Sequence, residues 1–521
     1  MIASRSFSAD ENYSGDFCMF YRKPNSKQPP LRFNIIDSPM GIGKSATLID
    51  LIRFHNRGED REPTRFIVFV PTIRERDCRY ARELNLKCPE TPPYNKSILE
   101  LIRNGDNIVT THALWSIFND ETLRAFHQSK YKYVAFFDEV PPLFRDVVGV
   151  GRKLDEMPGN VRFGAADVKL MQQSGMIFVK DGVIEFNPEC DYAKTDTDYK
   201  VFNAVKNLSY SCTLYPYGNK NGFFTSIIAF ARRELFECFR ECWFFSYLTH
   251  ESMLYKYCML RHISMEYYQI IDRRILRNPG GRFMETYPDG IEKLVILDGK
   301  PFNMEGSLSK RWYSRASRDE TQAGLKELRK KFRNAYQFMK ALGVHSDTFM
   351  FTTFNAYKDL LRSNGRYYPT LRRFLPCNTK ATNDYSNCTG VAYLCNRYFD
   401  VTCAHFLADR AKEENNPELI FNDDNYALSE LVQFIWRSNV RVQESRQPVY
   451  VWVPDQRMRI LLQDFQKRAL KRSKEGTIFH MHRKMRIANA KVIHKLSLVQ
   501  HRDEASLIRG YVRMRYFRLL S

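Results

Sequence analysis

The sequence predicts an α/β protein with parallel sheets and helices on both of their faces. From Arg32 onward, short apolar runs alternate with stretches of helical periodicity, which is the pattern of strands joined by crossover helices. A second series of the same kind starts at Leu294. Apolar residues make up 44% of the 521 residues, so the chain is long and apolar enough for about three domains with packed cores.

The order of the expected elements suggests four regions. Residues 1–30 are polar and contain prolines, so we expect a lead-in; domains over 31–250 and 251–460 and a basic helical extension over 461–521 follow. The expected strands are 33–36, 65–70, 107–110, 133–137 and 243–249 in the first domain, with a helix at 46–54, and 294–297, 348–352, 390–394 and 449–453 in the second.

An insertion is expected at about 150–205, where the α/β rhythm breaks. Two short apolar runs, 176–179 and 183–186, are joined by Lys180-Asp181-Gly182, which predicts a hairpin with an Asp-Gly turn. This hairpin does not belong to a parallel sheet. We therefore expect this segment to be inserted into the first domain.

The charge of the chain favours a polyanionic partner. Lys and Arg number 80 against 59 Asp and Glu, a net charge of +21. Residues 461–521 hold fifteen basic and four acidic residues, so +11 of the +21 lies there. We expect this segment to be a helix that binds the phosphates of nucleic acid. The alternatives are a solvated tail, a tail packed on the protein itself, or a generally basic protein.

Membrane insertion and secretion are not expected. No apolar run reaches about 18 residues, and the first residues lack the charged head and apolar stretch of a secretory signal. Twelve cysteines without a C-x-x-C pair are typical of buried thiols in a reducing compartment. A cytoplasmic location is therefore expected, or the host cytoplasm or nucleus if the protein is viral.

A zinc cluster is the one metal site that the cysteines suggest. Four of them lie within 27 residues, with a histidine nearby, at Cys377, Cys388, Cys395, Cys403 and His405. Their separations of eleven, seven and eight residues do not match the short ligand pairs of structural zinc sites. Buried thiols are therefore the better interpretation.

A phosphate-binding loop is indicated at residues 36–45, between an expected strand and an expected helix. Gly41 and Gly43 allow the backbone to turn so that its N–H groups face phosphate oxygens. In this pattern Lys44 reaches the terminal phosphates and the Ser45 hydroxyl ligates Mg²⁺. Ser38 stands where the strict pattern has its first glycine. The alternative is an ordinary glycine-rich turn.

An acidic pair, Asp138-Glu139, follows directly after the apolar strand at 133–137. Ligands gather at strand ends in parallel sheets, so Asp138 is a candidate for holding Mg²⁺. Glu139 is a candidate for polarising the attacking water. Such a pair alone is common on surfaces, but its place after a phosphate loop favours the catalytic interpretation.

An arginine-bearing helix is expected over residues 428–441. Its apolar residues fall on one side, and Gln433, Arg437 and Arg441 fall on the other within about 80°. Arginine from a second domain is the usual means of stabilising charge on a γ-phosphate. The alternative is a solvated amphipathic face.

Together these segments resemble the superfamily-two, DEAD-like helicases. In those helicases the first position of motif I is often Ala or Ser, which accommodates Ser38. The matching segments are 38–45 (motif I), 70–74 (Ia), 109–112 (Ib), 138–141 (II), 246–249 (III), 351–354 (IV), 381–384 (V) and 433–441 (VI). The Ser-Pro-Met-Gly-x-Gly-Lys phrase is also similar to replication origin-binding helicases of DNA viruses and phages.

The resemblance implies two RecA-like domains that hold ATP and Mg²⁺ between them. It implies a helicase or translocase on nucleic acid, with DNA favoured over RNA, and with replication proteins as possible partners. Nucleic-acid contacts would come from Thr72, Thr111, Thr353 and Thr382. Three departures are the four-residue spacing of Arg437 and Arg441, the loose motif III, and about 107 residues between Glu139 and Ser246. That gap is long compared with those helicases, which implies that the insertion at about 150–205 contacts DNA or a partner. A duplex translocase of a defence system and a non-enzymatic DNA-binding scaffold remain alternatives.

Overall fold

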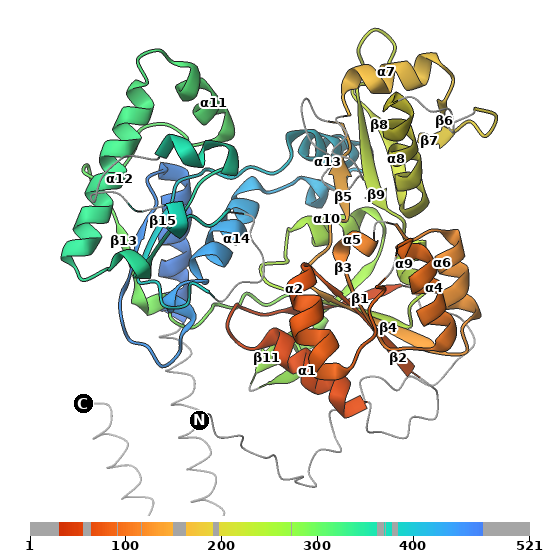
Figure 1. Cartoon of the computed structure of the whole chain (residues 1–521), viewed down its shortest axis with the longest axis horizontal. Coiled ribbons are helices and arrows are strands. Elements are labelled where there is room, and N and C mark those ends of the chain that lie inside the picture. Colours follow the sequence, from red (N-terminus) through yellow and green to blue (C-terminus); the bar gives the residue numbers. More distant parts are fainter. Residues whose placement is uncertain are drawn as a thin grey trace, which may run out of the picture.

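The structure is a computed structural model. It describes residues 31–55, 64–90, 92–115, 117–148, 163–190, 197–271, 273–361, 369, 371–377 and 384–472. The expected lead-in, residues 1–30, lies outside these ranges. The described chain forms two α/β bodies and a small antiparallel body next to the first of them (Figure 1).

A seven-stranded sheet forms the first body, in the order β12-β11-β1-β10-β4-β2-β3. All neighbouring strands are parallel except β11 and β12. The strands are β1 (Arg32–Asp37), β2 (Thr64–Val70), β3 (Ile108–Thr111), β4 (Lys132–Asp138), β10 (Glu241–Ser246), β11 (Ser264–Ile271) and β12 (Arg274–Arg277). This sheet therefore continues to Arg277, past the boundary that the sequence suggests at 250.

Helices cover both faces of this sheet, as the alternating pattern predicts. In β1, Phe33 and Ile35 point to one core and Ile36 points to the other. The Ile36 side is covered by α1 (Lys44–His55), and the other side by α4 (Tyr94–Asn104), α5 (His112–Trp115), α6 (Asp120–Gln128), α9 (Glu234–Glu237) and α10 (Met253–Leu260). The P-loop and the acidic strand end thus belong to one buried sheet.

The insertion is larger than the sequence suggests. Its three-stranded antiparallel sheet has the order β5-β9-β8. One face of this sheet packs in a core of the insertion's own, and the other face, with Phe144, Ile228 and Phe230, packs in the core of the first body. The elements are β5 (Phe144–Asp146), α7 (Ala165–Gln173), β6 (Ile177–Lys180), β7 (Val183–Phe186), α8 (Thr197–Ser211), β8 (Cys212–Tyr217) and β9 (Ser226–Ala231). β6 and β7 pair as the predicted hairpin, and Asp181 and Gly182 have φ of 51° and 75° at its turn.

A four-stranded parallel sheet forms the second body, in the order β13-β16-β15-β14. Its strands are β13 (Leu294–Leu297), β14 (Phe349–Thr352), β15 (Gly390–Tyr393) and β16 (Val449–Trp452). Its helices are α11 (Lys310–Arg318), α12 (Ala323–Ala341), α14 (Asp423–Ile435) and a helix over 456–472. Phe332 of α12 stacks on Trp452 in the shared core.

The last described helix corrects the expected start of the basic extension. Leu462, Phe465 and Ala469 are buried in the core of the second body, so residues 461–472 are part of that body. Residues 473–521 lie outside the described residues. Phosphate binding by them stays a prediction.

One helix crosses between the bodies. α13 (Val401–Glu413) follows β15 in sequence, yet Cys403, Phe406 and Leu407 are buried in the core of the first body. The Tyr217 hydroxyl of the insertion donates to Asp409, 2.8 Å away. The chain therefore passes between the bodies after β12, after β15 and again before α14.

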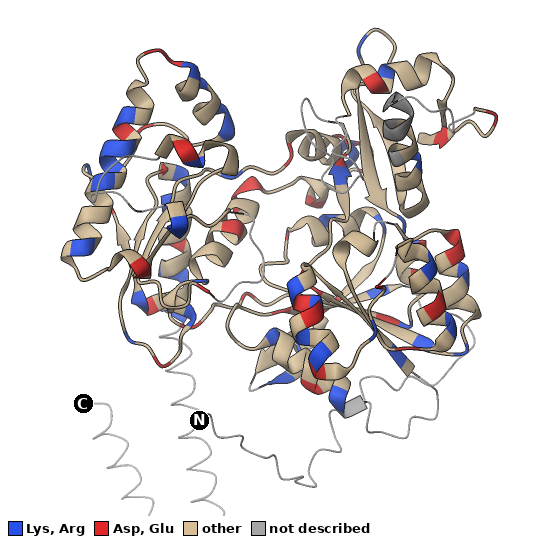
Figure 2. Ribbon diagram, in the orientation of Figure 1, with Lys and Arg blue, Asp and Glu red and all other residues tan. Residues whose placement is uncertain are grey.

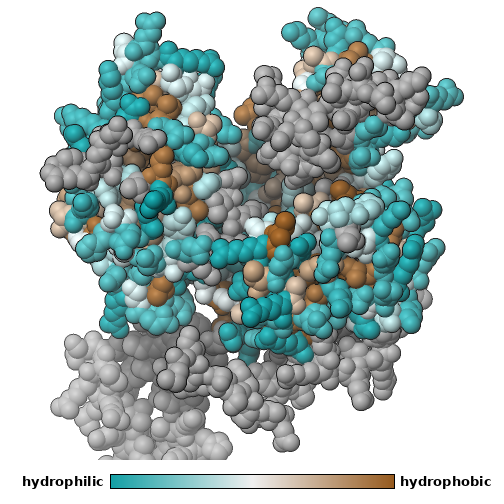
Figure 3. All heavy atoms as spheres, in the orientation of Figure 1, coloured by the Kyte–Doolittle hydropathy of each residue, from teal (hydrophilic) through white to brown (hydrophobic). Residues whose placement is uncertain are grey.

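Neither a metal cluster nor a membrane span is found among the described residues. Cys377, Cys388, Cys395 and Cys403 are buried, and the part of the chain with placed residues holds no group of three or more metal-ligating side chains. No described helix is long and apolar enough to cross a membrane. On the face shown in Figure 3, hydrophilic residues cover most of the described surface.

Candidate nucleotide site

The phosphate loop connects β1 to α1 and has the backbone that its glycines permit. Gly41 and Gly43 have φ of 88° and 87°, in the left-handed region that side chains disfavour. The Thr47 N–H donates to the Gly43 carbonyl at 2.8 Å, so the helix begins directly after the loop. Ser38 accepts from the Ile270 N–H through its hydroxyl at 3.0 Å, which gives a structural reason for serine at this position.

Lys44 lies over its own loop. Its Nζ donates to the carbonyls of Ser38 at 2.6 Å and Pro39 at 3.1 Å. Burial lowers the pKa of Lys44 to about 8, and the negative charges of Asp138, Asp37 and Glu139 oppose this shift. A cation in this position therefore faces a cluster of carboxylates.

The acidic strand end meets the P-loop across one intervening strand. β10 lies between β1 and β4 in the sheet. The Ser45 hydroxyl still donates to Asp138 Oδ2 at 3.0 Å. Asp138 is buried, and the loss of solvent raises its pKa. Two candidate oxygen ligands, predicted 93 residues apart in sequence, are thus in direct contact.

Glu139 has a strained backbone. Its φ is 67°, a value that non-glycine residues adopt at a cost of about 1–3 kcal/mol. Its N–H donates to the Phe245 carbonyl at 2.9 Å, which holds the chain to β10 while it turns. The turn takes the Glu139 side chain out of the strand, and the residue is half-buried.

Asp37 is a buried carboxylate that no sequence motif indicated. It accepts from the Thr249 N–H at 2.8 Å, from the Leu248 N–H at 3.2 Å and from the Thr249 hydroxyl. Burial raises its pKa, whereas these donors lower it. The segment after β10, which matches motif III only loosely, is thereby fastened to the strand that leads into the P-loop.

The arginine helix ends earlier than the sequence predicts. α14 stops at Ile435, and Asn439–Arg441 form a separate 3-10 turn, so the helix expected to 441 is wrong. The Ser438 hydroxyl donates to the Ile435 carbonyl at 2.6 Å, and the Asn439 N–H donates to the Cys388 carbonyl at 2.8 Å. These bonds take the place of further helical turns.

The two arginines reach different parts of the site. Arg441 lies at the P-loop, where its Cβ and its carbonyl are 3.7 Å from the position that a Cβ on Gly41 would occupy. Arg437 is oriented to interact with Glu139, whose charge opposes the lowering of the Arg437 pKa by burial. Gln433 donates to Ser429 at 3.0 Å within α14. The structure thus brings both arginines to the first body.

The four predicted nucleic-acid threonines differ in their surroundings. Thr72 caps α2 (Ile73–Glu75) by accepting from the Glu75 N–H at 3.2 Å, and Thr111 ends β3 half-buried. Thr353 is fully buried and donates to the Leu394 carbonyl at 3.3 Å, so its hydroxyl does not face solvent in this structure. Its contact with nucleic acid stays a prediction. Thr382 lies outside the described residues.

Two further residues of the site come from the segment after β2. Tyr80 is fully buried in a π-helical turn, Arg76–Ala81, and its hydroxyl donates to Asp138 Oδ2 at 2.6 Å. Arg79 interacts electrostatically with Asp138. Arg74, at the start of the segment, pairs with Asp384 of the second body at 3.2 Å. No sequence pattern marks such a turn, which explains why Tyr80 was missed.

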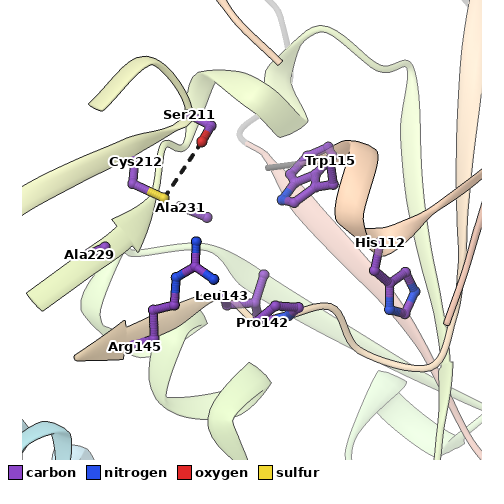
Figure 4. Close-up of a pocket in the computed structure, with 9 residues that line it drawn as sticks. All are labelled: His112, Trp115, Pro142, Leu143, Arg145, Ser211, Cys212, Ala229 and Ala231. Atoms are coloured by element: carbon purple, nitrogen blue, oxygen red, sulfur yellow. Dashed lines mark hydrogen bonds between the residues drawn. The ribbon is translucent and has the colours of Figure 1, made fainter. Parts of the chain in front are cut away.

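Two recesses lie elsewhere: one between the first body and the insertion, the other between the insertion and α13. The smaller, about 10 Å³, is surrounded by His112, Trp115, Arg145 and Cys212 (Figure 4) and has room for a water-sized group only. The larger, about 390 Å³, has Tyr217 and residues of α13 in its wall. Neither recess includes a P-loop residue.

Comparison with known proteins finds a family match, a similar prophage protein and similar solved structures. Residues 290–466 match the family described as the YonV C-terminal Rossmann-like domain. The SPbeta prophage-derived uncharacterized protein YonV of Bacillus subtilis (strain 168) is 27% identical over 452 residues, 83% of this chain and 98% of YonV. The structure of S. tokodaii Xpd4 is 13% identical, covers 83% of this chain and 94% of its own, and has a TM-score of 0.41.

Proposed function

We propose that the protein is an ATP-dependent nucleic-acid motor, a helicase or translocase with two RecA-like domains. One observation carries this proposal. Arg441 of the second body lies next to Gly41 of the P-loop, and in the first body the Ser45 hydroxyl donates to Asp138. A phosphate loop, an acidic strand end and an arginine from another sheet form the arrangement that phosphoryl transfer requires.

The residues fit MgATP as the ligand of this site. The Ser45 hydroxyl and the Asp138 carboxylate are hard oxygen donors, which Mg²⁺ prefers. The left-handed turns at Gly41 and Gly43 and the start of α1 suit a phosphate chain. When bound, MgATP would supply the phosphoryl group that is cleaved. Lys44 would exchange its loop carbonyls for phosphate oxygens.

Hydrolysis would use groups of both bodies. Glu139 would orient a water molecule and accept its proton. Arg441 would offset charge that develops on the phosphate, and Arg437 would hold Glu139 in place. Because the arginines and the P-loop belong to different bodies, movement of the two bodies toward each other would complete the site, and movement apart would release the products.

Nucleic acid is the partner that the charge of the second body favours. Residues 310–341, which contain α11 and α12, hold ten Lys/Arg and three Asp/Glu, a balance of +7. The first 460 residues together carry +10 (21 − 11), so the remaining 428 of them carry only +3. Figure 2 shows the concentration of basic residues on these two helices.

A basic stripe on α12 is the best-defined phosphate surface among the described residues. Lys326, Lys330 and Arg333 are exposed and follow one another at helical spacing. Within the described residues, none of the three has a carboxylate within ion-pair distance. A phosphate backbone would supply the missing negative charge. The prophage origin of YonV supports DNA of a mobile element as the substrate.

The decisive experiment is an ATPase assay of the wild type and of Lys44→Ala. Each protein is measured alone and with single-stranded DNA, duplex DNA and RNA. We expect hydrolysis by the wild type that DNA stimulates, and none by Lys44→Ala, which should still unfold in a cooperative thermal transition. Strand displacement would separate a helicase from a duplex translocase. A wild type without hydrolysis under all conditions would leave the binding scaffold as the better interpretation.

The partner is tested separately by removing the α12 stripe. Lys326→Gln/Lys330→Gln/Arg333→Gln should weaken DNA binding and flatten its salt dependence, by about 0.7–0.9 in the log–log slope for each phosphate that is no longer neutralised. The matched control neutralises three exposed cations of the first body, Lys96→Gln/Arg124→Gln/Lys132→Gln. Equal slopes for the two triple variants would contradict a role for α12.

A further inference from the structure

Tyr80 occupies a place that its sequence context does not explain. It lies in the π-helical turn Arg76–Ala81, between β2 and β3, and no part of its side chain is exposed. Most residues of that turn are at or near the surface. A π-helical turn holds an extra residue, which rotates one side chain out of the ordinary helical register. Here that side chain points into the nucleotide site.

The contact that Tyr80 makes is specific. Its hydroxyl donates to Asp138 Oδ2 at 2.6 Å, and the Ser45 hydroxyl donates to the same oxygen at 3.0 Å. Two donors at fixed positions leave the carboxylate little freedom to rotate. The other oxygen, Oδ1, is thereby held in one direction. A carboxylate that ligates a metal must be held in one orientation, and residues that hydrogen-bond to it but do not touch the metal provide that hold.

We propose that Tyr80 is a positioning residue that holds Asp138 in the orientation required to ligate Mg²⁺. This inference rests on the proposed ATPase function. Tyr80 does not itself touch the metal or the nucleotide. Its role is carried by the hydrogen bond to Asp138, and the aromatic ring fills the core around it.

The same segment connects this carboxylate to the second body. Arg74, six residues before Tyr80, pairs with Asp384 at 3.2 Å. Thr72 begins the segment and is a predicted nucleic-acid contact. A shift of this segment when a strand binds or when the bodies close would move the Tyr80 hydroxyl relative to Asp138. If the segment shifts in this way, Tyr80 would link strand binding to the geometry of the metal site.

Tyr80→Phe is the variant that tests this, because it removes the hydroxyl and keeps the ring. The matched control is Tyr133→Phe. Tyr133 is also buried in the first body, and its hydroxyl donates to the Asp106 carbonyl at 3.0 Å, away from the P-loop. Both variants lose one hydroxyl hydrogen bond, so a general loss of stability should affect both. A thermal melt of each records that loss.

The readout is binding of a fluorescent ATP analogue to the full chain while Mg²⁺ is varied. Tyr80→Phe should raise the Mg²⁺ concentration at half-maximal binding by about 10-fold or more, which is the usual cost of losing a second partner of a metal ligand. Tyr133→Phe should leave that midpoint unchanged. Binding in EDTA should be equal in all three proteins, since the P-loop itself is intact.

A second readout tests the link to strand binding. At saturating Mg²⁺, Tyr80→Phe should show a smaller fold-stimulation of hydrolysis by single-stranded DNA than Tyr133→Phe. A midpoint equal in the two variants would overturn the positioning role. A shifted midpoint with wild-type stimulation would overturn the link to the strand. If the wild type binds no nucleotide in a Mg²⁺-dependent way, the proposed function itself has failed.

Discussion

The two α/β bodies bring their groups to the nucleotide site in different ways. In the first body, Asp138 is the last residue of β4 and Ser45 lies in the first turn of α1. Their side chains are in direct contact. In the second, Arg437 and Arg441 come after the end of α14, and a turn held by Ser438 aims them. Groups on a sheet edge can be located from strand order alone. Groups on a turn depend on local hydrogen bonds that periodicity does not reveal.

Removing one arginine at a time should have the largest effect and should separate the roles of Arg437 and Arg441. Arg441→Ala should lower kcat by about 10³–10⁵-fold, because it removes the cation next to the P-loop. Arg437→Ala should cost less, since this side chain interacts with Glu139 rather than with the loop. Single-turnover hydrolysis with saturating ATP measures both. A larger loss for Arg437→Ala would reverse the assignment of the two roles.

The corresponding change in the first body is Glu139→Gln. The amide keeps the shape of the side chain and removes the base, so hydrolysis should slow by about 10²–10⁴-fold. Nucleotide and Mg²⁺ binding should persist, which equilibrium titration with a fluorescent analogue would verify. Unchanged turnover would place Glu139 outside the chemistry.

Two truncations sharpen the boundary of the second body. Deleting 461–521 removes the buried Leu462 and Phe465, and each such loss costs about 2–5 kcal/mol, so the protein should melt much lower or fail to express. Deleting 473–521 removes eleven basic and three acidic residues, a balance of +8, and should leave the melting temperature unchanged. If this segment binds phosphates, the salt slope of DNA binding should also fall. A slope equal to that of the full chain would end that interpretation.

The smallest expected effect concerns the half-buried charge of Lys44 in the P-loop. The unfolded chain keeps the Lys44 proton up to about pH 10.5, whereas the folded protein releases it near pH 8. Between these values the unfolded state binds more protons, so raising the pH should stabilise the wild type relative to Lys44→Met. We expect a relative gain of about 1–3 kcal/mol, because Lys44 is only half-buried and solvent screens it. Parallel denaturant titrations from pH 7 to pH 10 would measure it, and parallel curves would contradict it.

Strand positions were predictable because burial on both faces leaves long apolar runs. The runs before Asp37 and Asp138 reach the cores on both sides of the sheet, so their ends, and hence the P-loop and the acidic pair, could be located. Parallel pairing followed from the alternation with helices. The hairpin at Asp181-Gly182 was predictable because few residue pairs accept two left-handed φ angles.

The parts that were missed depend on contacts between distant segments. Thr353 was expected to contact the nucleic-acid backbone, but packing around β14 and β15 buries its side chain completely. Tyr80 lies in a turn whose extra residue leaves no periodic signal. The end of α14 was missed because its sequence continues an amphipathic pattern, while Ser438 and Asn439 divert the backbone. The limits of the insertion were missed because β9, whose six residues are all buried, is as apolar as the strands of the main sheet.

The crossing helix α13 has a consequence for the way the chain can be divided. Residues 290–466, the segment that matches a family of its own, include Phe406 and Leu407, which complete the core of the other body. Expressed alone, that segment would expose an apolar helix face that normally contacts Phe230 and Tyr217. The first body alone would lack part of its own interior. The two halves therefore depend on each other to fold, and a split protein should recover its solubility only when both pieces are made together.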